Sequence, residues 1–489
     1  MPDSPPAPGI WKRLIAGALL IVAATTVASA AFAFNELDKI VSALGQGKEL
    51  DVGQELALAE AGEPQTIMLI GSDKRNAQSE SVGDFGEPRS DTVILVRLDP
   101  KKGATALMSL PRDLLVDIPG HGRDRLNAAY ELGGPKLTLK TVKELTGLRI
   151  NHVVGIDFSG FIQAVDELGC VYVDVDRSYY SSGAEYAYIN LDAGYQQLCG
   201  DDTLAYVRFR HEDTDLVRGA RQNEFLRQAK EQYTFGNLVS GRNALLEIFG
   251  RFTDSDINSR ADTLELVKLA IASARLPVRE VHFEGQLGTE YVTASNSKIK
   301  SLTQKFLGVE ETEGPRSGER VEDDQPSAGD GGGGGGKDGG EEKFDANLDD
   351  ATAEGEAQAV AADDETVRFP IFYPTQKLPG STFSEQPTVY RIQTTGPGKL
   401  QAYRMVLSTG LVGEYYGLQG TAWTDPPILE SPDETRTIDG REYELHYDGD
   451  RLRLVAWRTD DGAYWVSNTL LQSLSEEEML GIAVSAREA

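Results

Sequence analysis

A break in composition divides this 489-residue chain. Residues 309–365 carry almost no large apolar side chains, and six consecutive glycines at 331–336 lie among many Asp and Glu residues. Such a segment cannot bury enough apolar surface to offset the conformational entropy that folding removes. We therefore predict a disordered, acidic, glycine-rich linker over 309–365, which leaves two ordered blocks at 61–308 and 366–489.

The N-terminus predicts a membrane anchor. Residues 14–34 contain no charged side chain and are long enough to cross a bilayer as a helix. Two basic residues precede this run and acidic residues follow it, so the positive-inside rule makes 1–13 a cytoplasmic tail. A cleaved signal peptide is the alternative, because small-residue cleavage patterns lie at 28–33. In either case the bulk of the chain is extracytoplasmic, and it begins with a juxtamembrane stalk over 35–60.

The first ordered block has the pattern of an α/β domain, because apolar strands alternate with amphipathic helices. We predict strands at 66–71, 92–98 and 104–110, whose short connections favour antiparallel pairing in sequence order. The net charge of −29 argues against nucleic acid as a partner, since nonspecific nucleic-acid binding needs a basic face.

Three polar residues flank these strands. Asp73 comes just after the first strand, Asp91 just before the second, and Arg112 shortly after the third. Antiparallel pairing returns all three residues to the same edge of the sheet. The turn-rich segment between Asp73 and Asp91 then becomes a surface loop beside the site.

Arginines gather in the same part of this acidic chain. Guanidinium groups suit multivalent anions such as phosphates, and paired carboxylates suit hard divalent cations. We predict a strand at 203–208 that places Arg208 and Arg210 at its end. Eight of the arginines between residues 73 and 222 are candidate site residues, because they lie near the ends of predicted strands or on the predicted helix: Arg75, Arg89, Arg112, Arg125, Arg208, Arg210, Arg218 and Arg221. Together with Asp73 and Asp91 they predict a metal-assisted pyrophosphate site.

A helix predicted from about Asp215 to about Tyr233 adds a second row of polar groups. At about 100° per residue, Asp215, Arg218 and Gln222 fall on one side of this helix. The spacing therefore directs all three side chains towards the same site.

The chain contains only two cysteines, Cys170 and Cys199. In an oxidising compartment such a pair is a disulfide candidate that closes a loop of about 30 residues. Two buried free thiols are the alternative. A zinc site is not indicated, because the pair has no nearby histidine.

The second ordered block, 366–489, predicts a small α+β module without a catalytic role. Alternating apolar and polar residues with Asp-Gly turns are typical of antiparallel hairpins. A terminal helix is expected after Ser475, with acidic residues in its first turn. Trp423, Trp457 and Trp465 either pack in the core, which is the favoured interpretation, or line a glycan- or partner-binding surface.

Six short strings resemble those of the LytR-CpsA-Psr family. In order they are GSD, RSDT, SLPRD, RLNAAYELGG, DFSGF and LAYVRFR, the last followed by a D..R..RQ spacing, and they span roughly residues 62–235. The resemblance implies a three-layer α-β-α domain with a mixed central sheet, behind one transmembrane helix of a bacterial cell membrane. It also implies a phosphotransferase that moves a glycopolymer from a polyprenyl-pyrophosphate carrier to peptidoglycan through a phosphodiester. The polymer would be teichoic-acid-like, arabinogalactan-like or capsular.

The same resemblance implies residue roles. The Mg²⁺-binding aspartates of the family match Asp73 and Asp91, with Mn²⁺ as the alternative ion. Its pyrophosphate-contacting side chains match Arg89, Arg112, Arg208, Arg210, Arg218 and Gln222. Further contacts are expected from Arg75, Arg125 and Arg221. One departure from the family pattern is the long 73–91 loop.

The expected reaction needs a base and an apolar channel. A peptidoglycan hydroxyl would attack the glycan-proximal phosphorus and expel polyprenyl phosphate, with Asp91 or Asp215 accepting the hydroxyl proton. Helices near 135–146 and 158–168 offer side chains for a polyprenyl channel, and ordinary core packing is the alternative role for the same residues. These side chains are Leu137, Leu139, Val142, Phe158, Phe161, Ile162 and Val165.

Three other functions are considered. A transcriptional regulator is disfavoured by the exported topology and the acidic charge. A non-catalytic wall-binding protein has less need of a paired-aspartate metal site. A pyrophosphatase, which would use water in place of the sugar hydroxyl, stays open, because the same residues would serve it.

Overall fold

The computed structural model describes residues 49–58, 60, 62–72, 90–183, 188–209, 213–232, 253–257, 260–273, 276–288, 291–316, 346–364, 367–396 and 398–489. The predicted membrane span at 14–34 lies outside these residues. Among the helices that are described, none is long and apolar enough to cross a membrane.

A mixed six-stranded sheet forms the centre of the first block. Its strands are β1 (Gln65–Ser72), β2 (Ser90–Asp99), β3 (Ala104–Leu110), β6 (His152–Asp157), β11 (Thr253–Ser255) and β12 (Val278–Glu280). They are ordered β11-β6-β1-β2-β3-β12, with β1, β2 and β3 antiparallel in sequence and with β6 and β12 parallel to their neighbours β1 and β3. The three predicted strands and their antiparallel order are confirmed.

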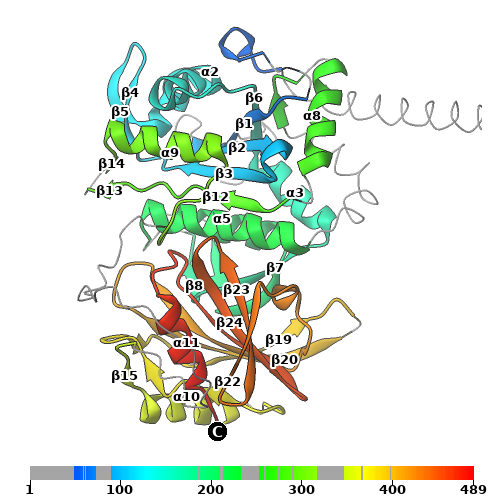
Figure 1. Ribbon diagram of the computed structural model, residues 1–489, viewed down its shortest axis with the longest axis vertical. Helices are drawn as coiled ribbons and strands as arrows, with labels where there is room; N and C mark the ends of the chain where they lie inside the picture. Colours follow the sequence, from blue (N-terminus) through cyan, green and yellow to red (C-terminus); the bar gives the residue numbers. More distant parts are fainter. Residues whose placement is uncertain are drawn as a thin grey trace, which may run out of the picture.

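Helices cover both faces of this sheet (Figure 1). They are α2 (Leu126–Thr146), α3 (Phe158–Leu168), α5 (Asp215–Gln232), α8 (Arg260–Ser273) and α9 (Asn296–Gly308), while α4 (Gly200–Arg208) packs against α3 and α5. On one face, Leu139 of α2 and Phe306 of α9 share a buried core cluster with Leu95 of β2. On the other face α5 reaches Thr92, which lies three residues from Leu95 and so points the opposite way. The domain is therefore a three-layer α-β-α sandwich.

Four two-stranded antiparallel sheets add to the described part of this domain. Their strands are β4 (Leu115–Ile118) with β5 (Gly122–Arg125), β7 (Val171–Val175) with β10 (Gly194–Leu198), β8 (Tyr179–Ser181) with β9 (Ile189–Leu191), and β13 (Gln286–Leu287) with β14 (Val292–Thr293).

The strand predicted at 203–208 is wrong, because this segment belongs to helix α4. Asp201 and Asp202 lie in its first turn, where carboxylates favour the positive end of the helix dipole. The free N–H of Gly200 at the helix start donates to the Asp166 carboxylate at 2.8 Å. These helix-start interactions outweigh the short apolar alternation that suggested a strand.

The C-terminal module comprises residues 346–489. Its main sheet joins β18 (Thr382–Phe383), β19 (Thr388–Gln393), β20 (Lys399–Ser408), β21 (Tyr415–Thr421), β22 (Glu434–Ile438), β23 (Arg441–Asp448), β24 (Arg451–Thr459) and β25 (Gly462–Ser467). Short strand pairs add β15 (Asp349–Asp350), β16 (Phe372–Tyr373), β17 (Gln376–Lys377) and β26 (Arg487–Glu488). Its helices are α10 (Thr352–Asp364) and α11 (Glu476–Val484).

Local predictions for this module are met at several points. Ser475 caps α11 in a capping box with Glu478, as expected from the acidic first turn. Trp423, Trp457 and Trp465 are all buried, with exposed fractions of 8%, 0% and 0%. The alternative of a tryptophan-lined binding surface is therefore wrong.

The predicted linker at 309–365 is too long at both ends. Residues 317–345 lie outside the described part of the chain, whereas 309–316 and 346–364 have defined positions. Ala359 and Ala362 of α10 are fully buried, because small side chains can pack closely even where large apolar ones are missing. Arg316 is also buried, against carboxylates from distant segments.

Helix α5 lies between the α/β domain and the C-terminal module (Figure 1). Two apolar clusters cross this boundary. One joins Tyr172 and Tyr195 to Trp423 and Trp465, and the other joins α5 to Leu470 and Leu471. The two ordered blocks therefore share buried apolar contacts.

Candidate active site

The loop after β3 and the start of α5 bring charged side chains together. Asp215, the first residue of α5, accepts a hydrogen bond from the backbone N–H of Arg112 at 2.9 Å. The Nε of Arg112 lies 3.8 Å from the same carboxylate, and the Arg218 guanidinium donates to it from one turn along the helix. One carboxylate therefore joins two arginines that belong to different sequence motifs.

Asp113 extends this group to Arg125. Its carboxylate lies 3.7 Å from the Nε of Arg112 and 3.9 Å from the Nη1 of Arg125. Burial raises the pKa of Asp113, and the nearby Asp215 carboxylate adds to the increase, while the arginines oppose it. We refer to Arg112, Asp113, Arg125, Asp215 and Arg218 as the charged cluster.

Sequence reasoning missed Asp113. The signal was its place beside Arg112 in the SLPRD string. A carboxylate next to an arginine there can orient the guanidinium, and the structure shows Asp113 between two of them.

Gln222 ties α5 to the sheet edge. Its amide nitrogen donates to the Thr92 hydroxyl and to the Val207 carbonyl oxygen, both at 3.1 Å. Asp215, Arg218 and Gln222 thus share one side of α5, as the helical spacing predicts. The contact with Thr92 brings this side of α5 to the start of β2.

The start of β2 contains a β-bulge. Gly71 pairs with Thr92, but Ser72 pairs with Ser90, so the register skips Asp91. A bulge re-aims the strand locally and is common beside active sites. The backbone therefore sets Asp91 apart at the sheet edge where β1 ends.

Several predicted site residues lie outside what the structure describes. They are Asp73, Arg75, Arg89 and Arg210, together with the side chain of Asp91. Their roles stay predictions.

Arg208 is the last residue of α4. Its guanidinium lies 4.0 Å from the centre of the Phe158 ring, in a cation–π arrangement. Phe158 begins α3, so this contact fixes the end of α4 against the start of α3.

The apolar side chains proposed for a lipid channel are mostly core residues. Leu139, Val142 and Val165 are at most 4% exposed and belong to buried clusters. Phe161 packs edge-on against Phe225 with ring centres 5.7 Å apart. The alternative role in ordinary core packing is therefore the correct one for these residues.

Arg221 does not occupy the expected position of a second pyrophosphate contact. Its side chain has no exposed surface and pairs with Asp213, which is also fully buried. It donates to the carbonyl oxygen of Phe209 at 2.8 Å and lies over the ring of Tyr179. Through its bonds to Phe209 and Asp213, Arg221 holds the two residues that flank 210–212, the segment that carries Arg210.

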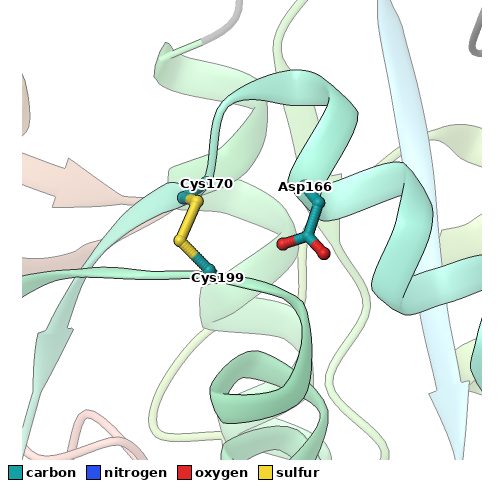
Figure 2. Close-up of side chains that lie close together, drawn as sticks. All are labelled: Asp166, Cys170 and Cys199. Atoms are coloured by element: carbon teal, nitrogen blue, oxygen red, sulfur yellow. A yellow bond between two sulfur atoms is a disulfide. The ribbon is translucent and has the colours of Figure 1, made fainter.

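The two cysteines form a disulfide. Cys170 precedes β7 and Cys199 caps α4, and the bond between them lies beside Asp166 (Figure 2). Both sulfur atoms are bonded to each other, so the three residues do not constitute a metal site in this state. The bond fixes the start of α4, the helix that ends at Arg208.

Sequence comparison identifies the family of proteins to which this chain belongs. A sequence model described as the LytR_cpsA_psr family matches residues 28–306, more than half of the chain. The chain belongs to the LytR_cpsA_psr family, which confirms the resemblance seen in its motifs.

Individual relatives are named for a specific activity. The chain is 28% identical over 315 residues to the polyisoprenyl-teichoic acid–peptidoglycan teichoic acid transferase TagU of Oceanobacillus iheyensis, covering 61% of this chain and 94% of that protein. It is 34% identical over 230 residues to the corresponding transferase TagT of Bacillus subtilis, covering 44% and 68%. A solved structure described as YwtF (TagT) with bound octaprenyl pyrophosphate lipid is 24% identical, covers 54% of this chain and 96% of that one, and has a TM-score of 0.36.

Proposed function

We propose that this protein is a phosphotransferase that attaches a polyprenyl-pyrophosphate-linked glycopolymer to peptidoglycan through a phosphodiester. The observation that carries the proposal is the pairing of Arg112 and Arg218 on the Asp215 carboxylate, beside the bulge at Asp91. Membership of the family and the transferase names of TagU and TagT support it.

The charged cluster suits a pyrophosphate. Asp215 accepts a hydrogen bond from the Arg218 guanidinium and lies 3.8 Å from the Nε of Arg112, so both guanidinium groups are held near the site before the substrate arrives and need little reorganisation to receive its negative charge. Arg125 lies 3.9 Å from Asp113 and keeps 43% of its side chain exposed, so its guanidinium is accessible to a ligand from solvent. Preorganised donors of this kind are worth about 10²–10³ in rate when one is removed.

The reaction breaks one phosphoanhydride bond. The oxygen of a sugar hydroxyl on peptidoglycan forms a bond to the glycan-proximal phosphorus, and polyprenyl phosphate leaves with the electron pair of the broken P–O bond. The hydroxyl proton passes to a carboxylate. Asp91 and Asp215 are the candidate bases; both oxygens of Asp215 already accept hydrogen bonds from Arg112 and Arg218, and Asp91 is also a candidate metal ligand.

A divalent cation fits the residues at the sheet edge. Asp73 and Asp91 would supply carboxylate oxygens, the donors that Mg²⁺ or Mn²⁺ prefers; Asp73 follows the last residue of β1 in the sequence, and Asp91 is the residue that the β1–β2 register skips. The other carboxylates beside this edge, Asp113 and Asp215, face arginines. A bound Mg²⁺ would neutralise charge on the pyrophosphate.

The proposed location follows from the uncharged run at 14–34 and from the disulfide. We place the chain as a single-pass protein of the bacterial cell membrane, with the described residues outside. Its proposed partners are the lipid-linked glycan, peptidoglycan and the membrane.

Transfer is tested with the purified full-length protein, Mg²⁺ and a polyprenyl-pyrophosphate-linked glycan, with and without peptidoglycan. We expect glycan on peptidoglycan, and a loss of about 10²-fold for Arg112→Ala. Arg123→Ala is the matched control, because Arg123 lies on the neighbouring hairpin with 65% of its side chain exposed. Release of free glycan phosphate at the same rate without peptidoglycan would instead identify a pyrophosphatase, and full activity of Arg112→Ala would refute the site.

A further inference from the structure

Helix α5 has two functional sides. At about 100° per residue, Asp215, Arg218 and Gln222 occupy one narrow arc, which faces the sheet edge and the charged cluster. Val217, Ala220, Glu224 and Arg227 occupy the opposite arc. The side that does not carry the site residues is the side that meets the C-terminal module (Figure 1).

The first half of this contact is apolar. Leu216, Val217 and Ala220 form a buried cluster with Leu470 and Leu471 of the module. All five residues are at most 7% exposed. The first two turns of α5, which carry Asp215 and Arg218 on the other side, therefore rest on the module.

The second half of this contact is ionic. Arg316 Nη2 lies 3.0 Å from Glu224 of α5, 3.2 Å from Glu280 of β12 and 2.9 Å from Asp448 of β23. Arg227 of α5 pairs with the same Asp448. A single arginine from the chain segment after α9 thus connects the helix, the α/β sheet and the module.

Arg453 completes this group, which we call the ionic latch. It lies 3.5 Å from Glu224. The latch contains three arginines and three carboxylates: Arg227, Arg316, Arg453, Glu224, Glu280 and Asp448. Their side chains are at most 15% exposed.

The charge balance of the latch is tight. Burial alone would raise the pKa of Glu224. The charges of Arg316, Arg453 and Arg227 outweigh this effect and lower the pKa to about 2. Removing one partner leaves a buried charge uncompensated, which is much more costly than losing an exposed pair. The positions of the six groups are therefore interdependent, and a change on the module side reaches α5 directly.

Chain lengths indicate that the contact between the C-terminal module and α5 is an addition to the α/β domain that this chain shares with TagU. The match to TagU uses 61% of this chain but already covers 94% of TagU. The part of TagU left over is too short to hold a counterpart of residues 346–489. The part of this chain outside the match therefore has no counterpart of similar length in that relative.

We infer that the C-terminal module is a positioning element of the catalytic unit, and that Glu224, Arg316 and Asp448 are positioning residues that hold Arg218 and Gln222 in place through α5. The inference rests on the proposed function for its kinetic test. Displacement of a catalytic group by about 1 Å costs up to about 10²-fold in rate, so loosening α5 by that amount is measurable.

The test uses Asp448→Asn in the full-length protein, which keeps the side-chain volume and removes one latch charge. Asp460→Asn is the control, because it makes the same change at an exposed turn of the same module. We expect Asp448→Asn to raise the KM for the lipid-linked glycan and to lower kcat/KM about tenfold to a hundredfold. Hydrogen exchange over 215–222 is expected to become faster. Asp460→Asn is expected to match the unmodified protein.

A merely structural role predicts a different result. If the latch only stabilises the fold, Asp448→Asn lowers the folded fraction but leaves the KM and the hydrogen-exchange rate of 215–222 unchanged in the protein that is folded. That result would overturn the inference. Should Asp448→Asn fail to fold, Arg316→Lys decides by the same two readouts, since it keeps the charge but loses the planar fork that joins Glu224 to Asp448. If the unmodified protein transfers no glycan, the proposed function fails, and the exchange measurement alone decides whether the latch holds α5.

Discussion

Replacing Arg221 by methionine separates support of the site from contact with the substrate. Methionine keeps much of the buried volume but removes the guanidinium. Breaking a buried ion pair costs about 3–5 kcal/mol. Asp213 keeps Arg177 as a partner at 3.0 Å, so we place the loss at the lower end, about 3 kcal/mol. At about 2–4 °C per kcal/mol for a domain of this size, Tm falls by about 6–12 °C.

The assay combines thermal unfolding with transfer kinetics on the folded protein. Arg221 bonds to Phe209 and Asp213, so its loss is expected to free the segment that carries Arg210 and to lower kcat/KM as well. Arg149→Met is the matched control, because Arg149 is exposed. A Tm change below about 2 °C, combined with a raised KM for the lipid-linked substrate, would refute this reasoning. It would restore Arg221 as a direct pyrophosphate contact.

Three further predictions concern stability. Burial, Arg453 and Arg458 lower the pKa of His446 from 6.5 to about 3, so protonation favours the unfolded chain, and the stability that is complete above pH 6.5 is lost as the pH falls towards 3. Between pH 7 and pH 4 this effect lowers the free energy of unfolding by about 3 kcal/mol, and His446→Gln is expected to remove that loss in denaturant titrations. A pH profile of stability that the substitution leaves unchanged would contradict this prediction. Replacing Cys170 and Cys199 by serine together opens a loop of 29 residues and is expected to cost about 3.5 kcal/mol, whereas an unchanged midpoint in denaturant would show that the bond does not constrain the unfolded chain. Gly219→Ala is expected to raise the stability of α5 by about 0.5–1 kcal/mol, because the nearest atom to the added methyl is 3.9 Å away, and a lower Tm would contradict this.

Sequence reasoning located the centre of the domain well. The strands at β1, β2 and β3 are apolar runs bounded by clear turns, so their limits and their antiparallel order were predictable. The side of α5 that carries Asp215, Arg218 and Gln222 was predictable for a similar reason, since helical spacing alone decides it.

The failures come from contacts between segments far apart in the chain. Six residues at 203–208 fit a strand or a helix, and the Asp166 carboxylate, 34 residues before Gly200, helps to decide for the helix. Arg316 belongs to a stretch with the composition of a linker, and only the buried carboxylates around it show that it is fixed. Composition reports what a segment can bury alone, not what other segments provide.

Arg221 illustrates a further limit. Its spacing from Arg218 gave no sign that it points into the core, because a buried arginine and a substrate-binding arginine have the same sequence signature. Asp213, which neutralises it, decides the difference through its position in the fold.

The ionic latch restricts how this protein can change over evolutionary time. Three of its six charges, Glu224, Arg227 and Glu280, belong to the α/β domain, and the rest come from the segment after α9 and from the module. A lineage that lost everything after α9 would keep two of these carboxylates and one arginine. The module can therefore be discarded or exchanged only together with compensating substitutions in α5 and β12, so the two parts are expected to be inherited as one unit.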